Sequence, residues 1–245
     1  MRITAILLDV EGTTTPINFV YKVLFPYARA RMRDFLLRSL SDEEVRAAVE
    51  ELAEQSAGET SAALPPLRLP ENTQETADAV AAHVRRLMEG DRKLTPLKVL
   101  QGKVWEEGYH SGELKGEVFP DVPPSLRLWR ARGATTCIYS SGSVLAQRLL
   151  FANTEHGDLS EFISDYFDTR VGAKTDPPSY STIANKMRLP PAGIVFISDV
   201  PAELDAARAA GLQTLLCVRP GNAPTQGHTT HARIRTFDEV RFPEP

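Results

Sequence analysis

The chain has 245 residues, of which 42% are hydrophobic and 24% are charged, and its formal net charge is -4 at pH 7. This length suits one large domain or two smaller ones, and the composition is typical of a soluble globular protein with a buried core. The negative charge and the lack of a basic tail argue against nucleic acid as a partner. No apolar run approaches the roughly 18 residues that span a bilayer, so we also expect no membrane partner.

The cysteines and the first residues bear on the cellular location. Cys137 and Cys217 are the two cysteines of the sequence, and each lies in an apolar run. Disulfide scaffolds need more cysteines, and neither residue has a metal-binding spacing. Asp9 and Glu11 interrupt the first apolar run, which excludes the pattern of a signal peptide. We therefore expect a cytoplasmic protein with buried, reduced thiols.

Short apolar runs predict the sheet. Five of them are typical of buried strands, at residues 3–8, 134–139, 162–167, 193–198 and 213–218. Segments with helical character follow the second, third and fourth runs, at residues 144–150, 179–187 and 202–210. Strands that alternate with helices predict an α/β fold with a parallel five-stranded sheet and crossover helices.

More than a hundred residues separate the first two predicted strands, and most of them have helical character. Two capping boxes and a Thr-Pro pair predict three helices, which begin at Ser41, Asn72 and Thr95 and run to Leu52, about Met88 and Trp105. Residues 56–70 are rich in Ser, Ala, Gly and Pro and predict a loop. We expect a helical domain at residues 16–119, inserted into an α/β core of residues 1–15 and 120–245.

Polar residues follow four of the predicted strands. They are Asp9, Glu11, Gly12 and Thr13 after the first, Ser140, Ser141 and Ser143 after the second, Lys174 after the third, and Asp199 and Glu203 after the fourth. The carboxyl ends of parallel strands lie at one edge of a sheet, where open α/β sheets bind ligands. This pattern predicts a single site that contains residues from all four segments.

These residue types suit phosphoryl chemistry. A carboxylate such as Asp9 can attack phosphorus while its neighbour Glu11 acts as acid or base. Serine hydroxyls at a helix N-terminus and a lysine suit a bound phosphate. Asp199 can complete an oxygen ligand set for Mg²⁺.

Each of these signals also has a purely structural interpretation. Ser143 can be an ordinary N-cap with turn serines before it, and Lys174 can be solvated. Glu203 can orient the site or simply favour the helix dipole, and the sequence leaves both open. His228 and His231 have the spacing of a metal pair, but they lie in a Gly-, Pro- and Thr-rich segment without acids, so we expect a solvated loop.

The order acids, serines, lysine and acid resembles the haloacid dehalogenase superfamily of aspartate-nucleophile phosphatases. The helical insertion has the position of that superfamily's first type of cap domain, and the resemblance implies a Rossmann-like core with three layers. Most of these phosphatases have Asp two residues after the nucleophile, whereas this chain has Glu11 at that position. Glu followed by Gly-Thr-Thr-Thr-Pro-Ile is similar to the enolase-phosphatases, or acireductone synthases, of methionine salvage. Further similar stretches lie at residues 23–28, 101–106, 111–116, 139–144 and 166–169.

The resemblance covers nearly the whole chain and is weakest between residues 56 and 70. It implies a bifunctional enzyme that converts 2,3-diketo-5-methylthiopentyl-1-phosphate, through the 2-hydroxy-3-keto enol phosphate, to the acireductone 1,2-dihydroxy-3-keto-5-methylthiopentene and phosphate. Asp9 would be the nucleophile and Glu11 the general acid, while Ser140, Ser141 and Lys174 would hold the phosphate. One Mg²⁺ per subunit would be bound by Asp9, the backbone carbonyl of Glu11 and Asp199.

Some assignments stay open at this point. Glu11 and Lys174 are both candidates for the base that removes the carbon-bound proton. Aromatic residues of the insertion could line a methylthio pocket, but core positions are the favoured interpretation; they are Phe19, Phe25, Trp105 and Tyr109. A small phosphorylated diketone is the expected partner and the expected state is a monomer. Two other functions compete: a generic Mg²⁺-dependent phosphatase of the superfamily, and a non-catalytic protein that binds phosphorylated metabolites and would tolerate loss of Asp9.

Overall fold

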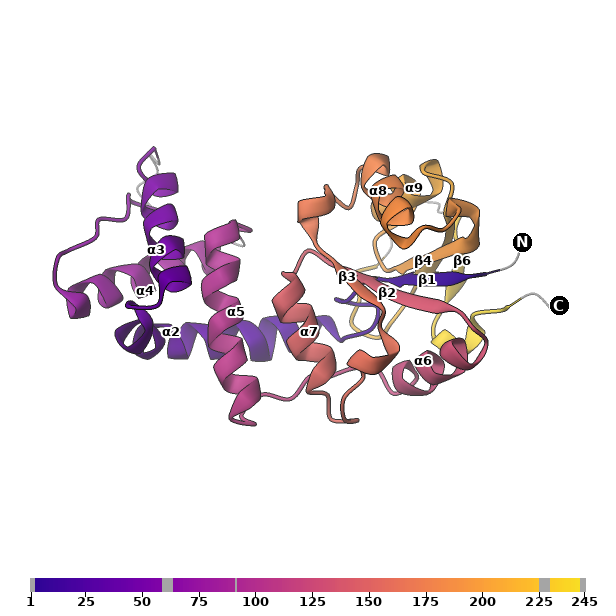
Figure 1. Cartoon of the computed structure of the whole chain (residues 1–245), viewed down its shortest axis with the longest axis horizontal. Helices are drawn as coiled ribbons and strands as arrows, with labels where there is room; N and C mark the ends of the chain where they lie inside the picture. Colours follow the sequence, from indigo (N-terminus) through magenta and orange to yellow (C-terminus); the bar gives the residue numbers. More distant parts are fainter. Residues whose placement is uncertain (1–2, 59–63, 91, 225–229, 243–245) are drawn as a thin grey trace. The chain divides into compact units, whose positions relative to one another are not determined.

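The computed structural model of the protein describes residues 3–58, 64–90, 92–224 and 230–242. The chain divides into two compact units. One comprises Met1–Val20 and Lys115–Pro245 and contains the sheet, and the other, Tyr21–Leu114, is helical (Figure 1). This division falls a few residues inside each end of the insertion expected at residues 16–119.

The sheet of the first unit has six parallel strands in the order β3-β2-β1-β4-β5-β6. The strands are β1 (Ala5–Leu8), β2 (Thr135–Tyr139), β3 (Asp165–Phe167), β4 (Ile194–Ser198), β5 (Gln213–Cys217) and β6 (Ala232–Ile234). The prediction of a parallel sheet is confirmed, whereas the count of five strands was wrong. The additional strand, β6, has three residues with Arg233 at its centre, so it forms no apolar run that would mark it as a strand.

Helices cover both faces of the sheet, which gives three layers. Helices α8 (Pro177–Met187) and α9 (Pro201–Ala209) lie on one face and α6 (Val122–Ala131) lies on the other, where α7 (Val144–Ala152) packs near β3 (Figure 1). Leu7 and Phe196 of the sheet share one buried cluster with Tyr180 of α8 and Leu204 of α9. This apolar layer fixes the strands that carry the polar residues at their carboxyl ends.

The central strand β1 pairs with β2 on one side and with β4 on the other. Leu8, its last residue, lies opposite Ile138 of β2 and Ile197 of β4. The chain moves outward from β1 in one direction through β2 and β3, and in the other through β4, β5 and β6. In open α/β sheets, the carboxyl ends of the strands at such a reversal form the usual ligand crevice.

The described residues of the second unit form four α-helices of more than one turn. They are α2 (Phe25–Ser39), α3 (Glu43–Ser56), α4 (Thr73–Glu89) and α5 (Thr95–His110). Helix α2 packs on α4 and α5, and α3 packs on α5. Asn72 caps α4 as predicted, since its side chain accepts hydrogen bonds from Gln74 N and Glu75 N. The cap of α3 is Asp42 and not Ser41, because the Asp42 carboxylate accepts from two backbone amides of the first turn.

Aromatic residues of the insertion lie mainly in the core, as favoured from the sequence. Phe19, Trp105 and Tyr109 are buried, and Trp105 donates a hydrogen bond of 2.8 Å from Nε1 to the Leu24 carbonyl. Phe25 stacks on Trp105, with ring centroids 6.4 Å apart. These contacts account for the aromatics as packing residues.

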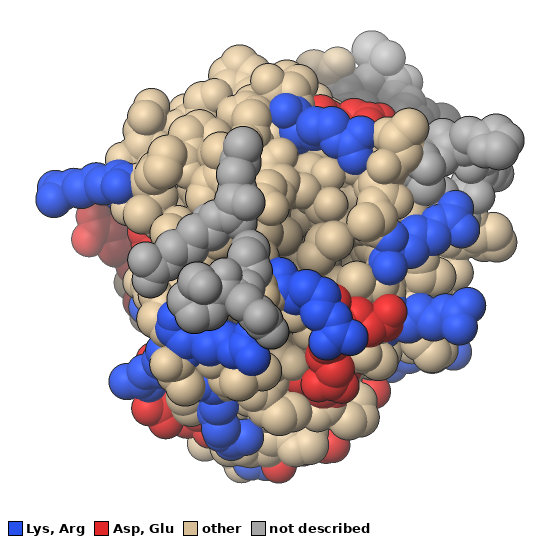
Figure 2. Space-filling model, turned by 90° about the vertical axis from the view of Figure 1, so that its right-hand side faces the viewer, with Lys and Arg blue, Asp and Glu red and all other residues tan. Residues whose placement is uncertain are grey.

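Shorter helical segments complete the described structure. They are α1 (Ile17–Phe19), the π-helix Val20–Leu24, and the 3₁₀ segments Ser160–Phe162, Thr169–Val171, Pro191–Gly193 and Phe237–Glu239. None of the helices in the described ranges is long and apolar enough to cross a membrane. Lys and Arg side chains are interspersed with Asp and Glu side chains on the face in Figure 2, so that this face has no large area of a single charge sign.

Candidate active site

Asp9 follows β1 and continues its pairing with β4. Its backbone N–H donates a hydrogen bond of 3.0 Å to the Ile197 carbonyl, and the residue is only 2% exposed. Lys174 Nζ lies 2.5 Å from Asp9 Oδ1. The first of the predicted site residues is therefore a buried carboxylate in contact with a lysine that lies 165 positions away in the sequence.

The backbone after Asp9 turns sharply. The Val10 carbonyl accepts hydrogen bonds from the amides of residues 13, 14 and 15, at 3.2, 3.0 and 3.0 Å. Gly12 has a φ of 74°, in the left-handed region that favours glycine. Thr14 Oγ1 donates to the Asp9 carbonyl at 3.2 Å, so this hydroxyl, and not that of Thr13, bonds the backbone of Asp9.

Asp199 follows β4 and lies against this turn. A Cβ atom on Gly12 would be 2.4 Å from Asp199 Oδ2, so only glycine permits the close approach. Burial, with the charges of Asp9 and Glu11, raises the pKa of Asp199 to about 7. Glu11 is half-buried, and its backbone pairs with Thr15. The three predicted carboxylates therefore lie within electrostatic range of one another.

Lys174 bridges two acids. Its Nζ lies 2.7 Å from Glu203 Oε2 as well as beside Asp9, and the lysine side chain is 8% exposed. Burial alone would lower the pKa of Lys174, but the charges of Asp9 and Glu203 outweigh burial and raise it. Tyr180 OH donates to the Lys174 carbonyl at 2.6 Å, which fixes the backbone at this position. Lys174 is thus a buried cation and not a solvated one.

Glu203 belongs to this group of charged residues and also lies in the first turn of α9, so it is compatible with both of its sequence-based interpretations. Burial and the Asp9 charge raise the pKa of Glu203 to about 7. Ser198 Oγ donates to Glu203 Oε2 at 2.9 Å and lies 3.4 Å from Asp9 Oδ2. Sequence reasoning missed Ser198, because a serine inside an apolar strand gives no signal of its own.

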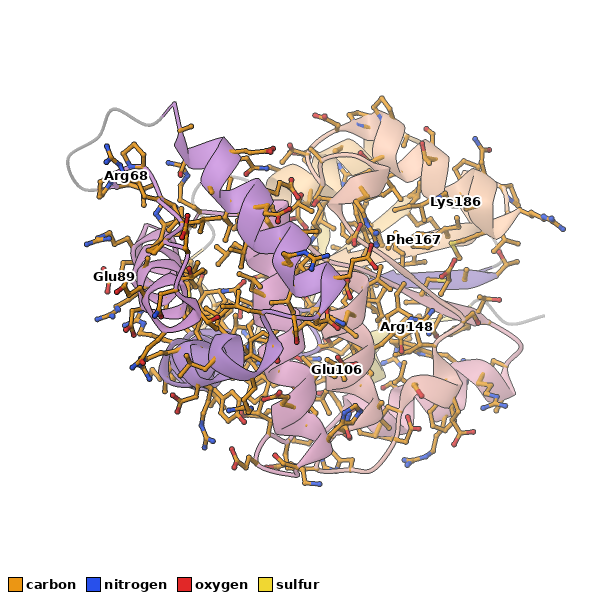
Figure 3. The ribbon with its side chains drawn as sticks, turned by 60° about the vertical axis from the view of Figure 1, so that its left-hand side comes forward. Arg68, Glu89, Glu106, Arg148, Phe167 and Lys186 are labelled. Atoms are coloured by element: carbon orange, nitrogen blue, oxygen red, sulfur yellow. The ribbon has the colours of Figure 1, made fainter. Side chains whose placement is uncertain are left out.

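Ser140 and Ser141 follow β2, the neighbour of β1. Ser140 is 1% exposed, and its backbone N–H donates a hydrogen bond of 3.1 Å to the Phe167 carbonyl. Phe167 is the last residue of β3 and is labelled in Figure 3. Gly142 N donates to Ser140 Oγ at 3.0 Å, and Ser141 is half-buried. Ser143 caps α7 by accepting from Ala146 N, so the structural interpretation is correct for this serine.

Gln147 supports the serine segment and was missed from the sequence. Its Nε2 donates to the Gly142 carbonyl at 2.8 Å and to the Phe167 carbonyl at 3.0 Å. A glutamine one turn into a helix resembles any other helical residue in a sequence, so no pattern marks it.

His231 is not in a solvated loop, and that prediction was wrong. It is 5% exposed, and Nε2 lies 3.0 Å from Asp205 Oδ1 while Nδ1 lies 2.8 Å from Thr214 Oγ1. His228 lies outside the described residues. The imidazole is held by partners on α9 and β5, which a local reading of the sequence could not detect.

Among the described residues, no group of three or more His, Cys, Asp or Glu side chains has an arrangement that could hold a metal ion. Asp9 and Asp199 nevertheless provide hard oxygen donors at neighbouring strand ends. Mg²⁺ in proteins is often bound by one or two carboxylates and several waters, so it does not need three such side chains. Burial and the charge of Asp9 raise the pKa of Asp199, and a divalent cation would favour the ionised carboxylate. These donors therefore fit Mg²⁺.

Comparison with known proteins shows the family to which the chain belongs. A family model of haloacid dehalogenase-like hydrolases matches residues 3–211, and the chain belongs to this family. The UTR4 protein of Saccharomyces cerevisiae has a crystal structure with a TM-score of 0.78 and 32% identity, and the match covers 97% of this chain and 100% of that one.

Curated relatives show which family within the haloacid dehalogenase-like hydrolases the chain belongs to. The enolase-phosphatase E1 of Synechococcus elongatus is 50% identical over 241 residues, 98% of each chain. That of Caenorhabditis elegans is 43% identical over 242 residues, again 98% of each chain. The chain is a member of the enolase-phosphatase E1 family.

Proposed function

We propose that the protein converts 2,3-diketo-5-methylthiopentyl-1-phosphate to its enol phosphate and then to the acireductone and inorganic phosphate, as a step of methionine salvage. The observation that carries this proposal is the buried Asp9 carboxylate with Lys174 Nζ 2.5 Å away. It lies at the end of β1 in a chain whose relatives are enolase-phosphatases.

Phosphate binding is assigned to Ser140, Ser141 and Lys174. The hydroxyl of Ser140 accepts from Gly142 N and retains a proton that it can donate to a phosphate oxygen. Lys174 brings a positive charge to Asp9, where the phosphorus atom would lie. These donors would offset the repulsion between a phosphate dianion and the carboxylates of the site.

Magnesium is the expected cofactor, one ion per subunit. Asp9, Asp199 and the backbone carbonyl of Glu11 would hold it. When bound, it would polarise the substrate carbonyl and neutralise phosphate charge.

Phosphate transfer follows from the roles of Asp9 and Glu11. An Asp9 oxygen attacks phosphorus, and the bond between phosphorus and the enol oxygen breaks as Glu11 protonates that oxygen. The resulting aspartyl-phosphate is then hydrolysed by water, from which the Glu11 carboxylate accepts a proton. The proton that Glu11 donates when the aspartyl-phosphate forms is recovered when the aspartyl-phosphate is hydrolysed.

Enolisation requires a base for a carbon-bound proton next to the substrate carbonyl. Lys174 and Glu11 were both candidates from the sequence. The raised pKa of Lys174 keeps its ammonium protonated at neutral pH, so it serves as a cation and not as a base. Of the two candidates, Glu11 in its carboxylate form is the one that can accept the proton, and it passes this proton to the substrate carbonyl oxygen to complete the enol. Glu11 then takes up a proton from solvent before phosphate transfer, and the proton that it regains from water at the end returns to solvent before the next turnover.

A substrate panel tests this function. The protein with Mg²⁺ is compared on the diketone phosphate and on a set of sugar and nucleotide phosphates, with Asp9→Asn as the inactive control. We expect kcat/KM to be at least about a hundredfold higher for the diketone phosphate, because a site built for one substrate discriminates by differential transition-state binding. Equal values across the panel would identify a generic phosphatase.

The organisation of the chain and its location are part of the proposal. The sheet unit would be the catalytic core, and the helical unit would act as the cap that provides specificity. The two free and buried cysteines, Cys137 and Cys217, support a cytoplasmic location. The monomeric state remains a prediction.

A further inference from the structure

Three successive carbonyls of the turn after Asp9 are held from outside the turn. The Gly12 carbonyl accepts from Asn222 Nδ2 at 2.9 Å, and the Thr13 carbonyl accepts from Arg219 Nε at 3.1 Å. The Thr14 carbonyl accepts from the backbone N–H of Phe119 at 2.9 Å. The turn is therefore fixed on its outer side by two side chains of the segment that follows β5.

Arg219 is itself held rigidly. Its guanidinium makes a bidentate pair with Asp121, at 2.9 and 2.8 Å, and also donates to the Arg235 carbonyl at 2.8 Å. It lies 4.5 Å from the ring centroid of Phe119 and 4.7 Å from that of Phe237. Its side chain is 2% exposed. A planar guanidinium can satisfy all these partners at once, whereas a lysine cannot.

Asn222 lies where the turn and Asp199 meet. A Cβ atom added to Gly12 would lie 3.1 Å from Asn222 Oδ1 and 2.4 Å from Asp199 Oδ2. The amide of Asn222 therefore contacts the turn at the glycine that permits the approach of Asp199. A shift of Asn222 would displace the backbone between Glu11 and Thr13.

We propose that Arg219 and Asn222 are positioning residues for the reaction. They hold the turn of residues 10–15 so that Glu11 and the backbone beside Asp199 keep their working geometry. Both residues lie beyond residues 3–211, which the family model matches. The kinetic part of this inference rests on the proposed function, whereas the structural part does not.

The test uses the full-length protein and two variants. Asn222→Ala removes the donor to Gly12, and Arg219→Lys keeps a charge beside Asp121 but removes the Nε donor to Thr13. Arg208→Met is the matched control, because Arg208 bonds Thr214 of β5 and makes no bond to the turn. Amide hydrogen exchange of the peptide over residues 9–20 is measured together with kcat and KM for the diketone phosphate.

We expect exchange in this peptide to rise about tenfold or more in both variants, because breaking outer hydrogen bonds lowers the free energy of local opening. We expect kcat to fall on the order of tenfold or more while KM changes less than about twofold, because Glu11 is displaced and the phosphate-binding residues are not. Arg208→Met should change neither quantity.

Unchanged exchange and kcat in Asn222→Ala would overturn the inference, as would equal effects in Arg208→Met. Should Arg219→Lys fail to fold, Asn222→Ala decides alone. Should the parent protein not act on the diketone phosphate, the proposed function fails, and the exchange measurement still decides whether these residues hold the turn.

Discussion

Lys174 Nζ lies 2.7 Å from Glu203 Oε2, which ties the lysine after β3 to the first turn of α9. The same nitrogen contacts Asp9, so one buried cation is shared by the carboxylate at the end of β1 and the carboxylate of a helix. Because a buried charge is costly without partners, the two carboxylates and this lysine stabilise one another in the fold. We expect the same lysine to hold the phosphate of the substrate.

Lys174→Met should destabilise the metal-free protein by about 3–5 kcal/mol, since it leaves two buried carboxylates without their cation. The matched control is Lys103→Met, which breaks the surface pair with Glu44. That change should cost about 0–1 kcal/mol. Urea denaturation measures both free energies of unfolding. Equal losses would contradict a special role for the buried lysine.

Asp9→Asn should abolish phosphate release, because an amide is a poor nucleophile toward phosphorus, while the fold is kept since the side-chain volume hardly changes. Acid quenching of the parent protein during turnover, followed by borohydride reduction and mass spectrometry, should locate the acyl phosphate on Asp9. A labelled residue elsewhere, or normal turnover in the variant, would rule out Asp9 as the nucleophile.

Glu11→Gln should lose both steps, because glutamine can neither accept the carbon-bound proton nor protonate the departing oxygen. Stopped-flow absorbance distinguishes the enol phosphate from the acireductone. Accumulation of the enol phosphate in this variant would show that another group is the base, while the role of Glu11 as the acid would stand. Phosphate release at the parental rate would remove both roles.

Magnesium affinity should depend on pH through Asp199. Because burial and Asp9 raise the pKa of this carboxyl to about 7, it is protonated at lower pH and must lose its proton to bind the ion. The apparent Kd should therefore rise up to about tenfold per pH unit below about pH 7. Calorimetric titrations at about pH 6 and about pH 8 measure it. Identical Kd values at both would contradict Asp199 as a ligand.

The raised pKa of Asp199 also determines how the stability of the folded protein changes with pH. The folded-state pKa of Asp199 is above its ordinary value, so this group's contribution to stability is present at low pH. It is lost in the metal-free protein as pH rises through about 7. Magnesium should offset that loss at higher pH, which thermal unfolding with and without the ion would detect. Asp199→Asn serves as the control without the titrating group.

The sequence predicted the strands that precede Asp9 and Asp199, because buried parallel strands form continuous apolar runs with an abrupt polar end. It did not predict β6, whose three residues include Arg233, since pairing with β5 and not local composition forms that strand. The pattern of strand ends placed Lys174 in one site with Asp9 and Glu203, whereas the partners of Arg219 and His231 could not be predicted. These residues and their partners are far apart in the sequence and meet only in the folded protein. An isolated arginine or histidine in a loop gives no sequence pattern that identifies its partner.

The most direct test of the central claim is a single reaction followed by two readouts. The protein is mixed with the diketone phosphate and Mg²⁺ while absorbance follows the enol and the acireductone and a coupled assay follows phosphate. We expect the enol signal to appear first and acireductone and phosphate then to form in equimolar amounts. Phosphate release without acireductone, or no reaction with this substrate, would contradict it.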